Sequence, residues 1–437
     1  MPSSPPPQAP PRTPPKTPTW DELLAEAEAA FRNGDLSRAA ASATLMLRDD
    51  AEDGRALLIL GATALAQRSH IEALAFTDRA IARWRRDGEA VPAALWHNRG
   101  IALGGLGRID DAVTSLAAAV EDAPNHRQYR TSLAMLLHAA GRQDEATAVA
   151  LAAAGAPENI VGAAVAYERG DLKATRLIID ATRVGFAAGA REQLADRQWH
   201  ELDTYRVYLD ALVTYRRAHP EPPTRSRETL YLVGDSHVLS PARFPLRFGG
   251  RSMVAIPRLV FGVKAWHLAQ AQAGRPNLYA AALARALHAL PEGAVAALSV
   301  GEIDCRADEG FLPALRRDGA LDPARMREVI RETVAQALAF AGEQAREAGL
   351  DLHVVNVPAP RHEFPGRGDE DARAVVDIVR GYNEALAESA ERLGMRVIDV
   401  HGESAGADGF AVRGRHLDSV HLMPDIFAKA TARRAGA

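Results

Sequence analysis

A short motif recurs four times in the first 150 residues of the chain. Its copies read GDLSRAA, RSHIEALA, GRIDDAV and GRQDEAT, and each contains an alanine: Ala39, Ala73, Ala112 and Ala146. These alanines are separated by 34, 39 and 34 residues. A period of this length holds one helix-turn-helix unit, which buries its apolar face only by stacking on its neighbours. The repeat therefore predicts a stack of helix pairs.

The third copy has the side chains that two closely crossing helices need. Small residues stand where the helices approach each other, and bulky residues fill the adjoining groove. The positions are Trp96, Gly100, Leu103, Gly107, Ala112, Leu116, Ala119 and Pro124. Over about residues 20–153 the pattern resembles the tetratricopeptide repeat, and this resemblance implies a surface that recruits a protein partner. An unrelated alanine-rich helical bundle is the alternative.

The repeat pattern weakens after the fourth copy and stops at a proline-rich stretch. A degenerate helix pair that includes YERGDLKA, at 167–174, extends the predicted array over residues 20–218. HPEPPTRSRE, at 219–228, contains three prolines and several charges, and we expect a linker there. The proline-rich residues 1–19 have little apolar surface to bury, so we expect a disordered tail before the repeats.

The hydrophobic pattern changes after the predicted linker. Short apolar runs alternate with helical stretches: TLYLV at 229–233, SMVAI at 252–256, AVAALSV at 294–300, LHVVNV at 352–357 and MRVIDV at 395–400. Alternation of strands and helices predicts a parallel sheet that helices cover on both faces. We expect residues 229–437 to form this α/β domain and to fold independently of the repeats. The predicted fold class is therefore α plus α/β.

Composition argues against several classes of function. The chain has 52 Lys and Arg against 56 Asp and Glu, in short runs, so we expect no nucleic-acid partner. No stretch approaches the roughly 20 apolar residues of a membrane span. Because Cys305 is also the only cysteine, we expect a soluble, cytoplasmic protein without a disulfide. Histidines lack ligand spacing and no phosphate-binding glycine loop occurs, so we expect neither a metal nor a nucleotide cofactor.

Polar segments follow the predicted strands, at the sheet edge where such folds bind their ligands. Ser236 follows the first strand in YLVGDSH, and Asp418 and His421 lie in RHLDSVHLMP near the end of the chain. A serine hydroxyl becomes a strong nucleophile when a neutral imidazole takes its proton. A carboxylate three residues before the histidine can accept its hydrogen bond and hold its tautomer. Asp-x-x-His alone is a weak pattern, but together with Gly-Asp-Ser after the first strand it favours a catalytic serine.

These blocks resemble the SGNH, or GDSL-type, hydrolase superfamily over residues 228–430. GDSH is similar to the nucleophile block, GEID falls at the position of the Gly-x-Asn-Asp block, and DSVH is similar to the terminal Asp-x-x-His block. The resemblance implies a flavodoxin-like, three-layer α/β domain. It also implies hydrolysis or transfer of ester-linked acyl groups, often acetyl groups on carbohydrates, without a metal. Ser236 would then be the nucleophile, His421 the base and Asp418 the residue that orients the base.

The oxyanion site departs from the family pattern. The resemblance implies donors from the backbone N–H groups of Ser236 and Gly262, with Gly249 and Gly250 competing for the second position. Ile303 stands where the family has an asparagine that donates through its side chain. Loss of one such donor lowers kcat on the order of 10²–10³-fold where nothing replaces it. Arg306 and Asn356 are the candidates to fill this gap, and the further candidates for substrate contact are Asp235, His237, Glu302 and Asp304.

Two classes of function remain open at this point. The first is a serine esterase that acts on an O-acylated small molecule or glycan, with the repeats recruiting a protein partner. The second is an interaction protein whose repeats bind a partner and whose hydrolase-like domain is degenerate. An O-acyltransferase would use the same three residues with a sugar hydroxyl in place of water. Covalent trapping of Ser236 distinguishes a catalytic domain from a degenerate one.

Overall fold

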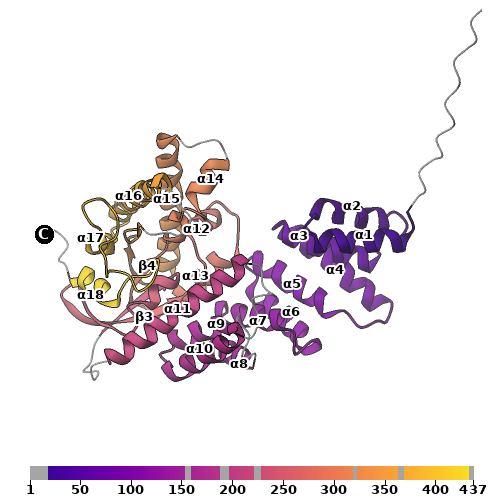
Figure 1. Ribbon diagram of the computed structural model, residues 1–437, viewed down its shortest axis with the longest axis horizontal. Helices are drawn as coiled ribbons and strands as arrows, with labels where there is room; N and C mark the ends of the chain where they lie inside the picture. Colours follow the sequence, from indigo (N-terminus) through magenta and orange to yellow (C-terminus); the bar gives the residue numbers. More distant parts are fainter. Residues whose placement is uncertain are drawn as a thin grey trace, which may run out of the picture. The chain divides into compact units, whose positions relative to one another are not determined.

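The computed structural model describes residues 18–152, 159–187, 196–220, 228–317, 322–362 and 369–432. Residues 1–17 of the predicted tail and residues 221–227 of the predicted linker lie outside this described part. The chain forms two compact units, residues 1–99 and 100–437. The first contains repeat helices, and the second contains the remaining helices and the sheet (Figure 1).

The first unit contains two complete helix pairs of the repeat. Its helices are α1 (Trp20–Arg32), α2 (Leu36–Met46), α3 (Gly54–Ala66) and α4 (His70–Arg86). Asp35 and Asp53 cap α2 and α3, because their side chains accept hydrogen bonds from backbone N–H groups in the first turn. The repeat alanines Ala39 and Ala73 are completely buried. Small side chains therefore occupy the contacts between helices, as the repeat pattern predicts.

The later copies of the repeat pack in the same way. Their helices are α5 (Ala93–Gly105), α6 (Ile109–Asp122), α7 (Arg127–Ala139) and α8 (Gln143–Leu151), followed by α9 (Ile160–Glu168), α10 (Leu172–Ala187) and α11 (Asp196–Ala218). A Cβ at Gly100 on α5 would lie 2.6 Å from Leu116 Cγ on α6, so this helix contact needs a glycine. Ala112, Leu116 and Ala119 are completely buried on α6. The predicted helical repeat array is confirmed.

Within the described residues, six strands form one sheet. The strands are β1 (Glu228–Gly234), β2 (Pro245–Phe248), β3 (Arg251–Leu259), β4 (Val295–Ser299), β5 (Asp351–Val355) and β6 (Val397–Ile398). Their order is β2-β3-β1-β4-β5-β6, and every neighbouring pair is parallel except β2 with β3. The prediction of a parallel sheet holds for five strands and is wrong for β2, a short antiparallel edge strand joined to β3 by a tight turn at Gly249 and Gly250. The sheet is mixed, and the region is compatible with an α/β domain.

Further helices alternate with these strands. They are α12 (Ala265–Gln272), α13 (Leu278–His288), α14 (Phe311–Arg317), α15 (Pro323–Glu347), α16 (Asp369–Arg392), α17 (Val400–Ser404) and α18 (Pro424–Ala432). Helices α13 and α15 contact β1 and β5, whereas α9 and α18 contact β3 and β2. Two short 3-10 helices, η3 (Ser236–Leu239) and η4 (Ile303–Cys305), follow β1 and β4. They stand at the edge of the sheet where the parallel strands end.

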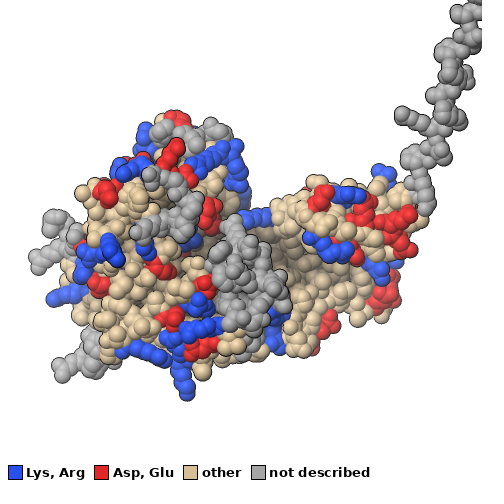
Figure 2. Space-filling view, in the orientation of Figure 1, with Lys and Arg blue, Asp and Glu red and all other residues tan. Residues whose placement is uncertain are grey.

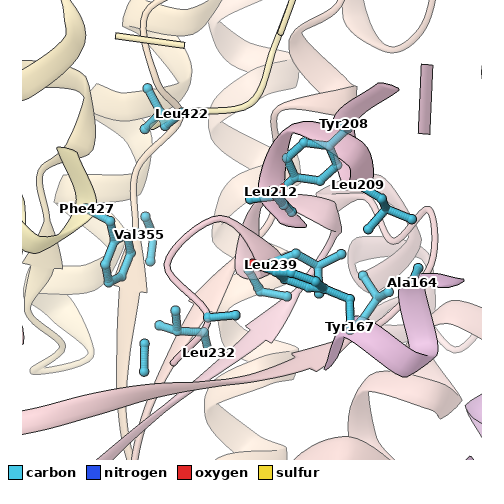
Figure 3. Close-up of a cluster of buried hydrophobic side chains, with 14 of the residues drawn as sticks. Ala164, Tyr167, Tyr208, Leu209, Leu212, Leu232, Leu239, Val355, Leu422 and Phe427 are labelled. Atoms are coloured by element: carbon cyan, nitrogen blue, oxygen red, sulfur yellow. The ribbon is translucent and has the colours of Figure 1, made fainter. Parts of the chain in front are cut away.

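One hydrophobic core joins the last helices of the array to the sheet (Figure 3). Tyr167 from α9, Tyr208 from α11 and Leu232 from β1 belong to the same buried cluster. The elements before and after the predicted linker at 219–228 therefore share this core. The two compact units instead separate within α5. The physical reason is that α9 and α11 bury their apolar faces with side chains of the sheet.

Candidate active site

Strand β1 delivers Ser236 to the C-terminal edge of the sheet. Its last residue, Gly234, pairs with Ser299 of β4. A Cβ at Gly234 would lie 1.9 Å from the Ser299 carbonyl oxygen, so the strands can pair this closely only with glycine at this position. The chain then turns into η3, and the Asp235 side chain caps this turn by accepting a hydrogen bond (3.0 Å) from the His237 backbone N–H. Asp235 thus has a structural role beside the nucleophile.

The fold brings Ser236 together with His421 and Asp418. The Ser236 hydroxyl lies 2.7 Å from His421 Nε2, and His421 Nδ1 lies 2.7 Å from Asp418 Oδ2. The other carboxylate oxygen, Oδ1, accepts hydrogen bonds from the backbone N–H groups of Val420 (2.9 Å) and His421 (2.7 Å). This turn explains the Asp-x-x-His spacing, because it holds the carboxylate of Asp418 against the imidazole that follows it.

The histidine and the aspartate have the ionisation states that proton transfer requires. Burial raises the pKa of Asp418, but the neighbouring His421 and the backbone N–H groups outweigh burial and hold this pKa at about 2. Burial lowers the pKa of His421, and the Asp418 carboxylate only partly opposes that shift. At pH 7 the carboxylate is therefore charged and the imidazole neutral. Nε2 is then able to accept the Ser236 proton.

Helix α11 contributes a contact that sequence analysis missed. The ring of Tyr208 stacks on the imidazole of His421, with ring centroids 3.6 Å apart and an interplanar angle of 8°. The Tyr208 hydroxyl donates a hydrogen bond to the Ser236 carbonyl oxygen (3.0 Å) and hydrogen-bonds to the Ser240 hydroxyl (2.8 Å). Tyr208 therefore positions both the base and the backbone of the proposed nucleophile. No local motif in α11 indicates this role, because the contact depends on how the helix packs.

A second tyrosine of α11 lies beside the same serine. Tyr205 precedes Tyr208 by three residues, and its ring meets the Tyr208 ring edge-on, with centroids 6.5 Å apart. On another side it lies 6.2 Å from the ring of Phe261, in the loop after β3. Burial raises the pKa of its phenol, and the interaction with the Ser236 side chain lowers this pKa in part. No local pattern in the sequence links this residue to the site, because 31 positions separate Tyr205 from Ser236.

The GEID segment forms a charged cluster next to the triad. Arg306 binds both carboxylate oxygens of Glu302 through Nε and one terminal nitrogen, at 2.6–3.0 Å. Glu302 Oε2 also lies 3.6 Å from His237 Nε2. Burial raises the pKa of Glu302, but Arg306 and His237 together hold it well below its usual range. The Ile303 side chain is buried among these residues and offers no hydrogen-bond donor.

Asp304 and Asn356 have structural partners. Asp304 accepts hydrogen bonds from two backbone N–H groups, at 2.8 and 3.1 Å, in the first turn of α12. Burial raises its pKa to about 6. The Asn356 side chain donates to Asp399 (2.7 Å) and accepts from the backbone N–H of His401 (2.9 Å). Because both ends of the Asn356 amide are engaged, this side chain does not fill the gap left by Ile303.

The loop after β3 lies at the same sheet edge as the proposed nucleophile. The backbone N–H of Val260 donates a hydrogen bond (2.7 Å) to the carbonyl oxygen of Gly234. Gly262 follows two residues later in a turn. Gly249 and Gly250 instead connect β2 to the start of β3, at the opposite end of that strand. Of these three glycines, Gly262 is the one at the candidate site.

Three further properties of the described part bear on function. In the described ranges, no group of three or more His, Cys, Asp or Glu side chains is arranged to hold a metal ion. Among the helices of the described residues, none is both long and apolar enough to cross a bilayer. On the face shown in Figure 2, acidic and basic side chains are interspersed over the described surface.

Comparison with protein families identifies the helical repeats. The family model of the tetratricopeptide repeat matches residues 24–88 and 97–160. The N-terminal region is a tetratricopeptide repeat array. This match confirms the resemblance drawn from the repeat alanines, and such repeats point to a protein partner. The match ends at residue 160 and leaves the sheet region unassigned. A search of curated proteins found no match to the chain.

Solved structures that resemble the chain include further tetratricopeptide proteins. YrrB, described as a TPR protein with an unusual peptide-binding site, is 19% identical; the match covers 40% of this chain and 91% of YrrB, with a TM-score of 0.32. A thermophilic TPR protein from Thermus thermophilus is 16% identical, with coverages of 44% and 100% and a TM-score of 0.35. A mutant of the Thermobaculum terrenum O-GlcNAc transferase is 14% identical, with coverages of 78% and 54% and a TM-score of 0.26. TM-scores this low do not show that the whole chain shares its fold with any of these proteins.

Proposed function

We propose that this protein is a serine-dependent ester hydrolase that removes the acyl group of an O-acylated substrate. One observation carries the proposal: Ser236, His421 and Asp418 are linked by two successive contacts of 2.7 Å. All three residues have little exposure to solvent, and the carboxylate holds the tautomer in which Nε2 can take a proton. These are the groups and the order that acyl transfer to a serine requires.

The order of the motifs along the chain supports the same activity. GDSH, GEID and DSVH follow one another as in the SGNH hydrolases that they resemble. That resemblance implies a small acyl group, such as acetyl, esterified to a hydroxyl of a small molecule or glycan. The family comparison assigns the repeats alone, so the proposed activity rests on the geometry of the three residues and on these motifs.

In the proposed reaction, Ser236 Oγ attacks the carbonyl carbon while His421 Nε2 takes the hydroxyl proton. The π electrons of the carbonyl move to its oxygen, and the charged Asp418 stabilises the imidazolium. When the tetrahedral intermediate collapses, the C=O bond re-forms, the ester C–O bond breaks, and the alcohol leaves with the proton from His421. Water then attacks acyl-Ser236 with the same proton transfers, which releases the acid and restores the serine.

A second candidate function is that of a non-catalytic interaction protein. The tetratricopeptide match favours it directly, since such repeats point to a protein partner. Ile303 favours it as well, because the proposed oxyanion site lacks a side-chain amide. The two functions are compatible if the repeats bring an esterase to its partner. Transfer of the acyl group to a sugar hydroxyl would use the same acyl-enzyme with a different acceptor.

Covalent trapping of the full-length protein tests the proposal. We expect a fluorophosphonate probe to label the peptide that contains Ser236, and Ser236→Ala to remove both the label and the hydrolysis of 4-nitrophenyl acetate. Ser252→Ala, at an exposed position near the start of β3, is the matched control and should keep both. The double variant Ser236→Ala/His421→Ala should lose no more than either single variant, because the residues act as a unit. Equal turnover by the wild type and Ser236→Ala would leave the interaction protein as the function.

A further inference from the structure

The proposed catalytic centre lacks one hydrogen-bond donor that its chemistry requires. Ile303 provides no donor, and the Asn356 amide is bound at both ends to Asp399 and His401. Arg306 binds Glu302 through two of its nitrogens. A negative charge that forms on a carbonyl oxygen at Ser236 needs donors that are already in place. The missing donor must therefore come from another element of the fold.

Helix α11 presents a hydroxyl at the required place. The helix is held at the site by Tyr208, which stacks on His421 and donates to the Ser236 carbonyl oxygen. Tyr205 lies three residues earlier on the same helix, so it projects on the same face. Its ring contacts the rings of Tyr208 and Phe261, and Phe261 immediately precedes Gly262 in the proposed oxyanion loop. The Tyr205 ring therefore neighbours both Tyr208, which contacts Ser236 and His421, and Phe261, which precedes the proposed oxyanion glycine.

We propose that the Tyr205 hydroxyl donates a hydrogen bond to the oxyanion, in place of the side-chain amide that Ile303 does not provide. This inference rests on the proposed esterase function. The attacked carbonyl carbon becomes bonded to Ser236 Oγ, so the oxyanion and Oγ are attached to the same carbon atom, and the phenol interacts with the Ser236 side chain. A small movement of the phenol from Oγ to the oxyanion is sufficient. Helix α11 is then part of the catalytic site.

The step balances without proton transfer from the tyrosine. Ser236 Oγ forms a bond to the carbonyl carbon, its proton moves to His421 Nε2, and the carbonyl electron pair moves to the oxygen. The Tyr205 O–H donates a hydrogen bond to that oxygen and keeps its proton throughout. When the intermediate collapses, the electron pair returns, the ester C–O bond breaks, and the leaving alkoxide takes the proton from His421.

The surroundings of Tyr205 suit a donor that keeps its proton. Burial raises the pKa of the phenol, and the interaction with Ser236 opposes this shift only in part. The phenol is therefore neutral at any pH at which the esterase is expected to work. A neutral phenol that is partly buried can donate a hydrogen bond to a developing negative charge and keep its own proton.

Removing one hydroxyl from the full-length protein tests this role. Tyr205→Phe keeps the ring that packs against Tyr208 and Phe261. We expect kcat for 4-nitrophenyl acetate to fall about 10²-fold, with KM changed by less than about twofold and Tm unchanged. Tyr215→Phe is the matched control, because Tyr215 lies on the same helix but stacks on His219, with ring centroids 4.2 Å apart. The control should keep the wild-type kcat.

Restoring a hydrogen-bond donor in the Tyr205→Phe variant distinguishes a catalytic role of the hydroxyl from a role in packing. Ile303→Asn introduced into Tyr205→Phe should recover about tenfold in kcat, since the amide replaces the lost hydroxyl in transition-state stabilisation. If the wild type is labelled at Ser236 and turns over, but Tyr205→Phe keeps the full kcat, the role of Tyr205 is overturned and the esterase stands. A fall in Tm that accounts for the loss of activity also overturns it. A wild type without label or turnover overturns the esterase itself.

Discussion

The ring of Tyr208 lies face to face with the imidazole of His421, with centroids 3.6 Å apart and planes within 8° of parallel. The tyrosine comes from α11, whereas the histidine lies 213 residues later, before α18. The same tyrosine bonds through its hydroxyl to the Ser236 carbonyl oxygen. The Tyr208 ring thus positions the imidazole of His421, and the Tyr208 hydroxyl positions the backbone of Ser236.

Two substitutions separate these contacts of Tyr208. Tyr208→Phe keeps the stack and leaves the Ser240 hydroxyl without this partner, so we expect a loss of about 1–3 kcal/mol of stability and a modest loss of kcat. Tyr208→Leu also removes the stack, worth about 0.5–1.5 kcal/mol beyond burial, and should lower kcat further. Steady-state kinetics and thermal melts measure both effects. Equal kcat in the two variants would show that the stack does not position His421.

The activity should rise with pH on its acidic side. His421 acts as the base only when neutral, and burial places its pKa below the ordinary value of 6.5, so the rate should approach its plateau by about that pH. The Asp418 carboxylate raises the His421 pKa, while His237 lowers it and Glu302 raises it. Asp418→Asn removes the first of these influences and leaves the other two.

In Asp418→Asn we therefore expect the acidic limb of the profile of kcat/KM against pH to move to lower pH. We also expect kcat to fall by at least about 10²-fold, because an amide does not hold the tautomer that the base requires. Profiles of kcat/KM against pH for the wild type and the variant measure both changes. A limb that stays in place, or moves to higher pH, contradicts the assignment of His421 as the base next to Asp418.

Fragments of the chain should behave according to the shared core. A fragment that starts at Thr224 lacks α9 and α11, and with them Tyr208, Leu209 and Leu212, all completely buried. We expect it to expose apolar surface, bind a hydrophobic dye and lose activity. A fragment of residues 100–437 keeps this core and should fold with turnover close to that of the full chain. A soluble, active fragment from Thr224 would show that the sheet region is independent of α11.

The repeat packing makes a prediction about two glycines in helices. A Cβ at Gly100 would lie 2.6 Å from Leu116 Cγ, whereas a Cβ at Gly381 on α16 would meet only Ile330 Cδ1 at 3.9 Å. Gly100→Ala should lower the free energy of unfolding by about 1–3 kcal/mol through overpacking. Gly381→Ala should raise it by up to about 1 kcal/mol, since alanine favours the helix. Denaturant titrations that show both variants stabilised would contradict the close contact between α5 and α6.

Local features of this protein were predictable from its sequence. The repeat alanines predict stacked helix pairs, because each pair needs small residues at fixed positions to approach its neighbour. The contact between Asp418 and His421 was also predictable, since a three-residue spacing fits within a single turn. The apolar runs at 229–233 and 294–300 predict β1 and β4 for the same reason: hydrophobic patterning along a few residues sets which segments become buried strands.

Only the tertiary structure decided which distant residues complete the candidate site. Tyr208 contacts the triad, with Tyr205 packed beside it, because α11 buries its apolar face with the sheet, and no pattern within α11 specifies that partner. Through the same packing, elements on both sides of the predicted linker at 219–228 share one core. Asn356 was a reasonable candidate donor from its position after a strand, yet its partner Asp399 caps α17 after β6, and its partner His401 lies in that helix. Local spacing specifies contacts within a turn or a repeat, whereas contacts between segments far apart depend on the packing of whole faces, which sequence spacing does not encode.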